Sequence, residues 1–134
     1  MIFKNIFSFP SVYKERNKEI KELQIFLIDV KIVDNKIIIE SNCNGYNQTI
    51  EFQKNIIKPS THIKIFCSCS SFKYEFASVL KKYDSLYNDN LFVNKLPKEK
   101  NPYRVICGCK HLIKFAEFIK KNINMINRRL NINE

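Results

Sequence analysis

The chain has 134 residues, the usual size of one domain, and a formal net charge of +10 makes it strongly basic. Its 45% hydrophobic and 13% aromatic residues can form a modest core, and no run approaches the roughly 18 apolar residues of a membrane span. The positive charge favours acidic partners. Residues 1–10 lack a secretory-signal pattern, so we expect a protein that is made in the cytoplasm and has no membrane segment.

A basic N-terminal arm and four strands come first along the chain. Residues 1–20 form the arm, which carries Phe3, Phe7 and Phe9. Asp34-Asn35 and Asn44-Gly45 mark tight turns. Between and around these turns, segments rich in β-branched residues predict an antiparallel β-meander with strands at 23–33, 36–41, 48–53 and 63–67.

Two helices are expected after the strands. Residues 70–83 place apolar side chains at helical spacing, with Ser70 or Ser71 as cap, and 84–106 form an irregular insert. From 112 to 130 one apolar stripe runs for about five turns, with lysines and arginines beside it. Burial on the sheet is the simplest use of this stripe as a whole. Its end, around Ile126 and Leu130, is nevertheless expected to overrun the domain and meet a partner.

The predicted fold is therefore α+β, a small antiparallel β-meander followed by two helices. We divide it into an arm at 1–20, a single domain at 21–121 with its insert at about 84–106, and a helical extension at 122–134.

Two short cysteine and histidine pairs predict a metal site that staples this fold. Cys67 and Cys69 lie two residues apart, so a strand would direct both sulfurs to one side. Cys109 and His111 stand at the start of the last helix, where the positive end of the helix dipole stabilises a thiolate. Zinc takes four such ligands in a tetrahedron. We therefore predict one structural zinc ion bound by Cys67, Cys69, Cys109 and His111.

Spacing alone leaves alternatives open. Cys107 in place of His111 would give a site of four thiolates, because Gly108 lets the turn fold either way. The cysteines could also be ordinary core residues, whereas their odd number, five, disfavours a disulfide framework. Cys43 is expected to be an unligated thiol and His62 a strand or turn residue.

The pattern C-x-C, a spacer, then C-x-H before a helix resembles the SWIM-type zinc finger. The likeness covers about residues 60–121, with Phe72 and Leu112 as apolar neighbours of the two pairs. More narrowly, 66–76, the Pro- and Lys-bearing insert and 109–112 resemble small SWIM-containing proteins of tailed bacteriophages. This resemblance implies a viral setting.

We expect no enzyme, because four protein ligands leave zinc no open position and the chain has no Gly-rich phosphate loop or nucleophile motif. The favoured function is a structural or assembly protein of a tailed-phage virion, located in the virion and docked onto other virion proteins through its terminal segments. The alternative is a SWIM-type nucleic-acid-binding protein that contacts DNA or RNA through its basic face.

Overall fold

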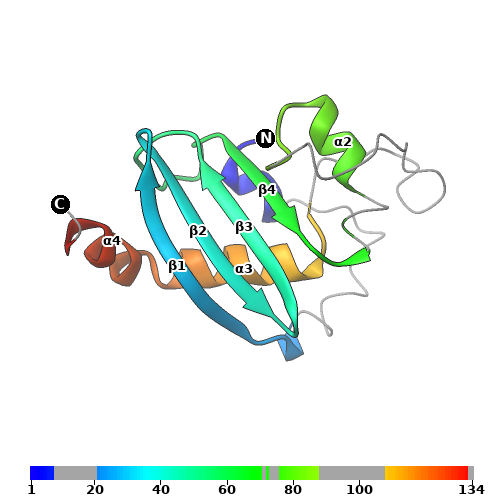
Figure 1. Ribbon diagram of the computed structural model, residues 1–134, viewed down its shortest axis with the longest axis horizontal. Coiled ribbons are helices and arrows are strands. Elements are labelled where there is room, and N and C mark those ends of the chain that lie inside the picture. The colour runs from blue at the N-terminus through cyan, green and yellow to red at the C-terminus, as the bar shows by residue number, and fades with distance from the viewer. Residues whose placement is uncertain (8–20, 71, 73–75, 88–107, 133–134) are drawn as a thin grey trace.

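A computed structural model describes residues 1–7, 21–70, 72, 76–87 and 108–132 of the chain. The four strands form one antiparallel sheet in the order β1-β2-β3-β4, and α3 crosses behind one face of it (Figure 1). This confirms the predicted α+β fold. The elements are η1 (Phe3–Phe7), β1 (Ile25–Val33), β2 (Lys36–Cys43), β3 (Tyr46–Phe52), β4 (Ile63–Cys67), α2 (Ala77–Lys82), α3 (Lys110–Lys121) and α4 (Ile123–Ile132).

The two tight turns form where the sequence predicts them. Asp34 and Asn35 have φ angles of 52° and 62°, and Asn44 and Gly45 have 52° and 90°. Two successive positive φ angles are what a two-residue hairpin needs to match the twist of its strands, and Asn, Asp and Gly adopt them at least cost. These turns fix the register of β1 on β2 and of β2 on β3.

One face of the sheet carries the core. The register places Ile39 opposite Ile50 and Ile50 opposite Ile65, so that the same side of three strands is apolar. Helix α3 packs its own buried side chains, Phe115 among them, against this layer. The sheet residues that form the layer are Val30, Ile37, Ile39, Ile50, Phe52, Ile63, Ile65 and Cys67.

The opposite face of the sheet, which we call the open face, has no described helix across it (Figure 1). Phe26 and Ile28 on β1 are 62% and 55% exposed. Ile28 occupies the point where the register of β1 on β2 shifts, between Leu27 and Asp29, as in a β-bulge. Exposed apolar side chains therefore remain on this face in the described part of the chain.

The first seven residues belong to the domain. Phe3 is 4% exposed, and its ring lies 5.1 Å from that of Phe52 in an edge-on contact. Ile2 forms a β-bridge with His62, and the N-terminal amine donates a hydrogen bond to Ser85 Oγ at 2.7 Å. The expectation that Phe3 docks on another chain is wrong, because η1 closes one end of this chain's own core. Phe9 lies outside the described residues.

The last predicted helix is two helices, because the chain breaks at Asn122. Its φ and ψ are −115° and 25°, and its side-chain Nδ2 donates to the Phe118 carbonyl at 2.9 Å. A side-chain amide that bonds the local backbone competes with helix continuation. The break lets α4 pack beside β1, where Ile126 and Leu130 are buried. The expectation that these two residues overrun the domain is therefore wrong.

Helix α2 confirms part of the helix predicted at 70–83, although it follows Phe76, which makes no side-chain cap bond. After α2, Leu86 forms a parallel bridge with Ile65. The rest of the expected insert, from 88 onward, lies outside the described residues, and so does the remainder of the predicted arm, 8–20. Among the described helices, none has the length and apolar character needed to cross a membrane.

Candidate metal centre

Four buried donor atoms converge at one end of the sheet. Cys67 ends β4, and Cys69 follows two residues later. Cys109 is the residue before α3, and His111 is the second residue of that helix. The three sulfurs and one His111 ring nitrogen all lie within 4.8 Å of one another. The four residues predicted as ligands are thus brought together by the fold.

The size of the cluster fits a tetrahedral ion. With metal–sulfur bonds of about 2.3 Å and a metal–nitrogen bond of about 2.0 Å, neighbouring donors of a tetrahedron lie about 3.5–3.8 Å apart. Nδ1 of His111 is 3.8 Å from the sulfur of Cys67 and 3.8 Å from that of Cys109. The donor set and its spacing can therefore hold one metal ion, with Nδ1 as the histidine ligand.

Backbone contacts hold the C-x-C pair in place beyond the end of β4. Asn47 and Ser68 exchange two hydrogen bonds, from Ser68 N to Asn47 O and from Asn47 N to Ser68 Oγ, both 2.9 Å long. The Phe72 N–H donates to Cys69 Sγ at 3.3 Å. The turn that brings Cys69 back beside Cys67 is thus tied both to β3 and to the start of the following segment.

Close packing holds the second ligand pair. Gly108 precedes Cys109, and a Cβ added to it would lie 2.9 Å from Leu112 Cβ. The Tyr46 ring lies 4.9 Å from the His111 ring. Because Leu112 is fully buried, the chain can enter α3 this close to the Leu112 side chain only with glycine at position 108.

Electrostatics show why the cluster suits a cation. Hydrogen bonds from Cys109 and Cys67 lower the pKa of the Cys69 thiol. A hydrogen bond to Cys109 lowers the pKa of the Cys67 thiol, but a hydrogen bond to Cys69 and burial raise it more. The pKa of Cys67 therefore rises to about 12. Burial, followed by bonds to the other two sulfurs, raises the pKa of Cys109. Without a cation the cluster thus favours a single thiolate, whereas a divalent metal would compensate three.

Gln48 is part of this centre, and the sequence analysis did not single it out. It lies on β3 opposite Cys67, and its Nε2 donates to Cys67 Sγ at 3.5 Å. The alternation of side chains along a strand could have identified it in the sequence. Gln48 shares its face of the strand with Ile50 and Phe52, so its side chain must point inward.

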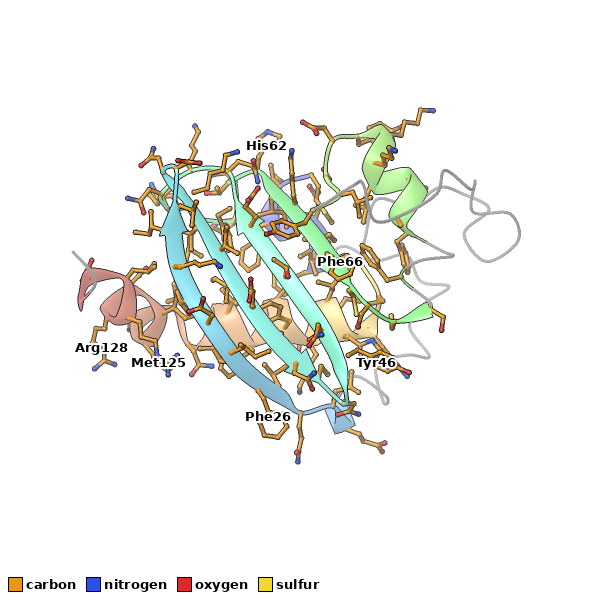
Figure 2. The ribbon with its side chains drawn as sticks, in the orientation of Figure 1. Phe26, Tyr46, His62, Phe66, Met125 and Arg128 are labelled. Carbon is orange, nitrogen blue, oxygen red and sulfur yellow. The ribbon has the colours of Figure 1, made fainter. Side chains whose placement is uncertain are left out.

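The other sequence candidates fall outside the cluster. Cys43 is buried at the end of β2, and burial raises the pKa of its thiol. His62 is exposed and bridges to Ile2, as expected for a strand or turn residue (Figure 2 labels it). Cys107, the alternative ligand in a site of four thiolates, lies outside the described residues.

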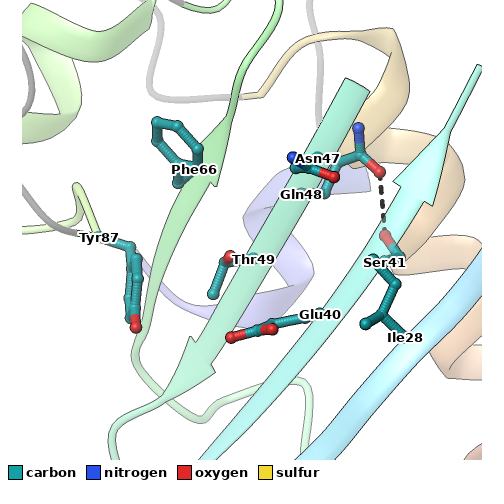
Figure 3. A pocket seen from close by; sticks show the side chains of 8 residues that line it. All are labelled: Ile28, Glu40, Ser41, Asn47, Gln48, Thr49, Phe66 and Tyr87. Carbon is teal, nitrogen blue, oxygen red and sulfur yellow. Dashed lines mark hydrogen bonds between the residues drawn. The ribbon is translucent and has the colours of Figure 1, made fainter. Parts of the chain in front are cut away.

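A shallow cavity of about 390 Å³ lies on the open face (Figure 3). Phe66, Thr49 and Tyr87 line one part of it, and Glu40 another. Among its lining residues no group of metal-ligating side chains comes together. The metal centre is therefore the stronger candidate site in the described part of the chain.

Comparison with protein-family models, with curated proteins and with solved structures finds no match.

Proposed function

We propose that the cluster is a structural zinc site of the SWIM type. Its support is the donor set, three cysteines and one histidine in the order C-x-C then C-x-H before a helix, all buried and with their donor atoms within 4.8 Å of one another. Thiolates favour zinc over hard cations such as magnesium or calcium. Four protein ligands fill a tetrahedron and leave no position for water or substrate. The proposed ion therefore stabilises the fold and takes part in no reaction.

Elemental analysis of fresh, reduced protein tests the site. We expect about one equivalent of zinc, as a single closed site requires. Cys107→Ser should retain it, whereas His111→Ala should lose it. Less than half an equivalent in the natural chain would contradict the proposal, and loss of zinc in Cys107→Ser would favour the four-thiolate site.

On this scaffold, we propose a non-enzymatic structural or assembly protein of a tailed-phage virion, made in the host cytoplasm. The resemblance to small SWIM-containing phage proteins supports this proposal. The surface that fits another virion protein is the open face, where Phe26 and Ile28 are exposed (Figure 2 labels Phe26). Apolar side chains that water surrounds in the free protein gain free energy when a partner covers them.

Incorporation into particles tests this role. The double variant Phe26→Ser, Ile28→Ser should fold normally yet be depleted from purified particles, as measured by quantitative mass spectrometry. Tyr83→Ser is the matched control, because Tyr83 is also about half exposed but follows α2 and does not belong to β1. Absence of the natural chain from particles, or equal incorporation of both variants, would contradict the proposal.

Nucleic-acid binding is the second candidate, and the charge of the helices favours it. From residue 110 to 132, Glu117 is the single acidic residue. Lys120 and Lys121 are exposed on α3, and Arg128 and Arg129 on α4 (Figure 2 labels Arg128). The ion pairs found within the described part of the chain involve Lys31 and Lys64 on the sheet and none of these four. We propose that Lys120, Lys121, Arg128 and Arg129 contact phosphate groups.

Salt dependence separates the two functions. Binding to phosphates releases counterions, so the affinity for DNA or RNA should fall steeply with salt and fall further in Arg128→Glu, Arg129→Glu. Retention in particles through the open face should change little with salt. Particles that release the protein at high salt, together with salt-sensitive binding of free nucleic acid, would make nucleic-acid binding the better account.

A further inference from the structure

Gln48 has a buried side-chain amide, and both of its polar atoms have hydrogen-bond partners. Its side chain is 1% exposed and points into the layer that α3 covers. Nε2 donates to the Tyr46 carbonyl at 2.8 Å and to Cys67 Sγ at 3.5 Å. Oε1 accepts from the Ser41 hydroxyl at 2.9 Å, the contact that Figure 3 marks with a dashed line. A buried amide is tolerated when its polar atoms are bonded in this way.

These partners fix which end of the amide faces the sulfur. The Tyr46 carbonyl only accepts hydrogen bonds, so it must face the amide nitrogen and not the amide oxygen. The Ser41 hydroxyl can donate to the oxygen on the other side. The group turned toward Cys67 is therefore an N–H donor, held in place from two directions.

We infer that Gln48 is a positioning residue of the metal centre, which holds the Cys67 thiolate through an N–H···S hydrogen bond. This inference rests on the proposed zinc site and deepens it. A donor aimed at sulfur favours the anionic ligand form, because a hydrogen bond to an ionised acceptor is stronger than one to a neutral acceptor. Such outer partners orient metal ligands and moderate their electron donation.

The Phe72 N–H, 3.3 Å from Cys69 Sγ, serves the neighbouring ligand in the same way. Both sulfurs of the C-x-C pair thus receive an N–H group, one from the backbone and one from the Gln48 side chain. A side-chain donor can be removed by substitution, which makes the Gln48 contact testable.

Gln48→Met tests the inference, because it keeps a side chain of similar length and removes the donor. Thr49→Val is the matched control, since Thr49 is the next residue of β3, is buried and faces the other side of the sheet. We expect Gln48→Met to release zinc to a chelator about 10-fold faster or more, and Thr49→Val to behave as the natural chain. With cobalt in the site, the sulfur-to-metal charge-transfer band of Gln48→Met should move to lower energy.

A measurement on the natural chain removes the dependence on how well the variant folds. With ¹¹³Cd in the site, a scalar coupling between the metal and a Gln48 side-chain amide proton is expected through the hydrogen bond. Should Gln48→Met fail to fold, this coupling decides alone.

The possible failures are distinguishable. If the natural chain holds no zinc, cobalt or cadmium, the proposed metal site fails and the inference with it. If the natural chain holds metal but shows no coupling, and Gln48→Met matches Thr49→Val in release rate and band energy, the Gln48 inference alone is overturned.

Discussion

Gly108→Ala probes the packing that places the second ligand pair. The added Cβ would meet Leu112 Cβ at 2.9 Å and Leu112 Cδ1 at 3.2 Å, with Ile65 Cδ1 behind them at 3.4 Å. Side-chain Cβ atoms in proteins keep a greater distance than the first of these, and Leu112 is fully buried, so the start of α3 must shift. Overpacking of this kind costs about 1–3 kcal/mol.

The expected shift in melting temperature follows from chain length. At about 2.1 cal/mol/K per residue, a chain of 134 residues has an unfolding entropy of about 0.28 kcal/mol/K. A loss of about 1–3 kcal/mol then lowers Tm by about 4–11 °C. Because Gly108 adjoins Cys109, the same shift should also loosen the metal centre and speed zinc release to a chelator.

Thermal unfolding and chelator competition measure the two effects on the metal-loaded protein. Lys121→Ala is the control, because this exposed residue lies in the last turn of the same helix and its loss should change stability by less than about 0.5 kcal/mol. A Gly108→Ala protein with the Tm and release rate of Lys121→Ala would refute the reasoning, since it would mean that a Cβ at position 108 fits beside Leu112 without a shift of α3.

Four further outcomes are expected. Ile126→Ala should lower the unfolding free energy of the isolated protein by about 2–5 kcal/mol in urea, because the side chain is buried within the chain; unchanged stability would restore an outward role for α4. Phe3→Ala should lower the unfolding free energy by about 3–5 kcal/mol in the same assay. A decrease no larger than that of a substitution at an exposed residue would contradict the burial of η1. Zinc binding near neutral pH should release protons from Cys67 and Cys109, because their raised pKa values keep both thiols protonated without metal. Calorimetry in buffers of different ionisation heat should detect the released protons. Zinc binding without proton release would contradict the prediction. The raised pKa of Cys67 also stabilises the metal-free fold below pH 9, and that contribution should be lost as pH rises toward about 12.

The strands and the ligand cluster were predictable because local chemistry determines them. Strand β4 lies where the sequence placed it, at Ile63–Cys67, and both tight turns fall on residues that tolerate positive φ. The four clustered donors differ from the rest of the chain in chemistry and in spacing, so their convergence did not depend on knowing the tertiary packing.

The fate of the terminal apolar residues was not predictable in the same way. Periodicity shows that Ile126 and Leu130 share a face, but the partner of that face depends on where α4 lies relative to β1. That position depends on Asn122, whose side chain bonds the Phe118 carbonyl where the helix breaks. Likewise, Phe3 could be assigned to the core only once Phe52 was seen at the end of the sheet that η1 covers.

The candidate metal centre joins parts of the chain that are remote in sequence, and this bears on why a small domain would hold a metal ion there. Cys69 and Cys109 are separated by residues 70–108, and closing a loop costs free energy that grows only slowly with its length, by about 0.6 kcal/mol for each doubling. The binding free energy of an ion would offset the free energy of closing this loop. The ion would also fix the start of α3 against the end of β4. The rest of α3 could then cover the apolar face of the sheet whatever the length of the spacer. On this argument the proposed zinc ion does more than add stability, since it sets the position from which the main helix of the core begins.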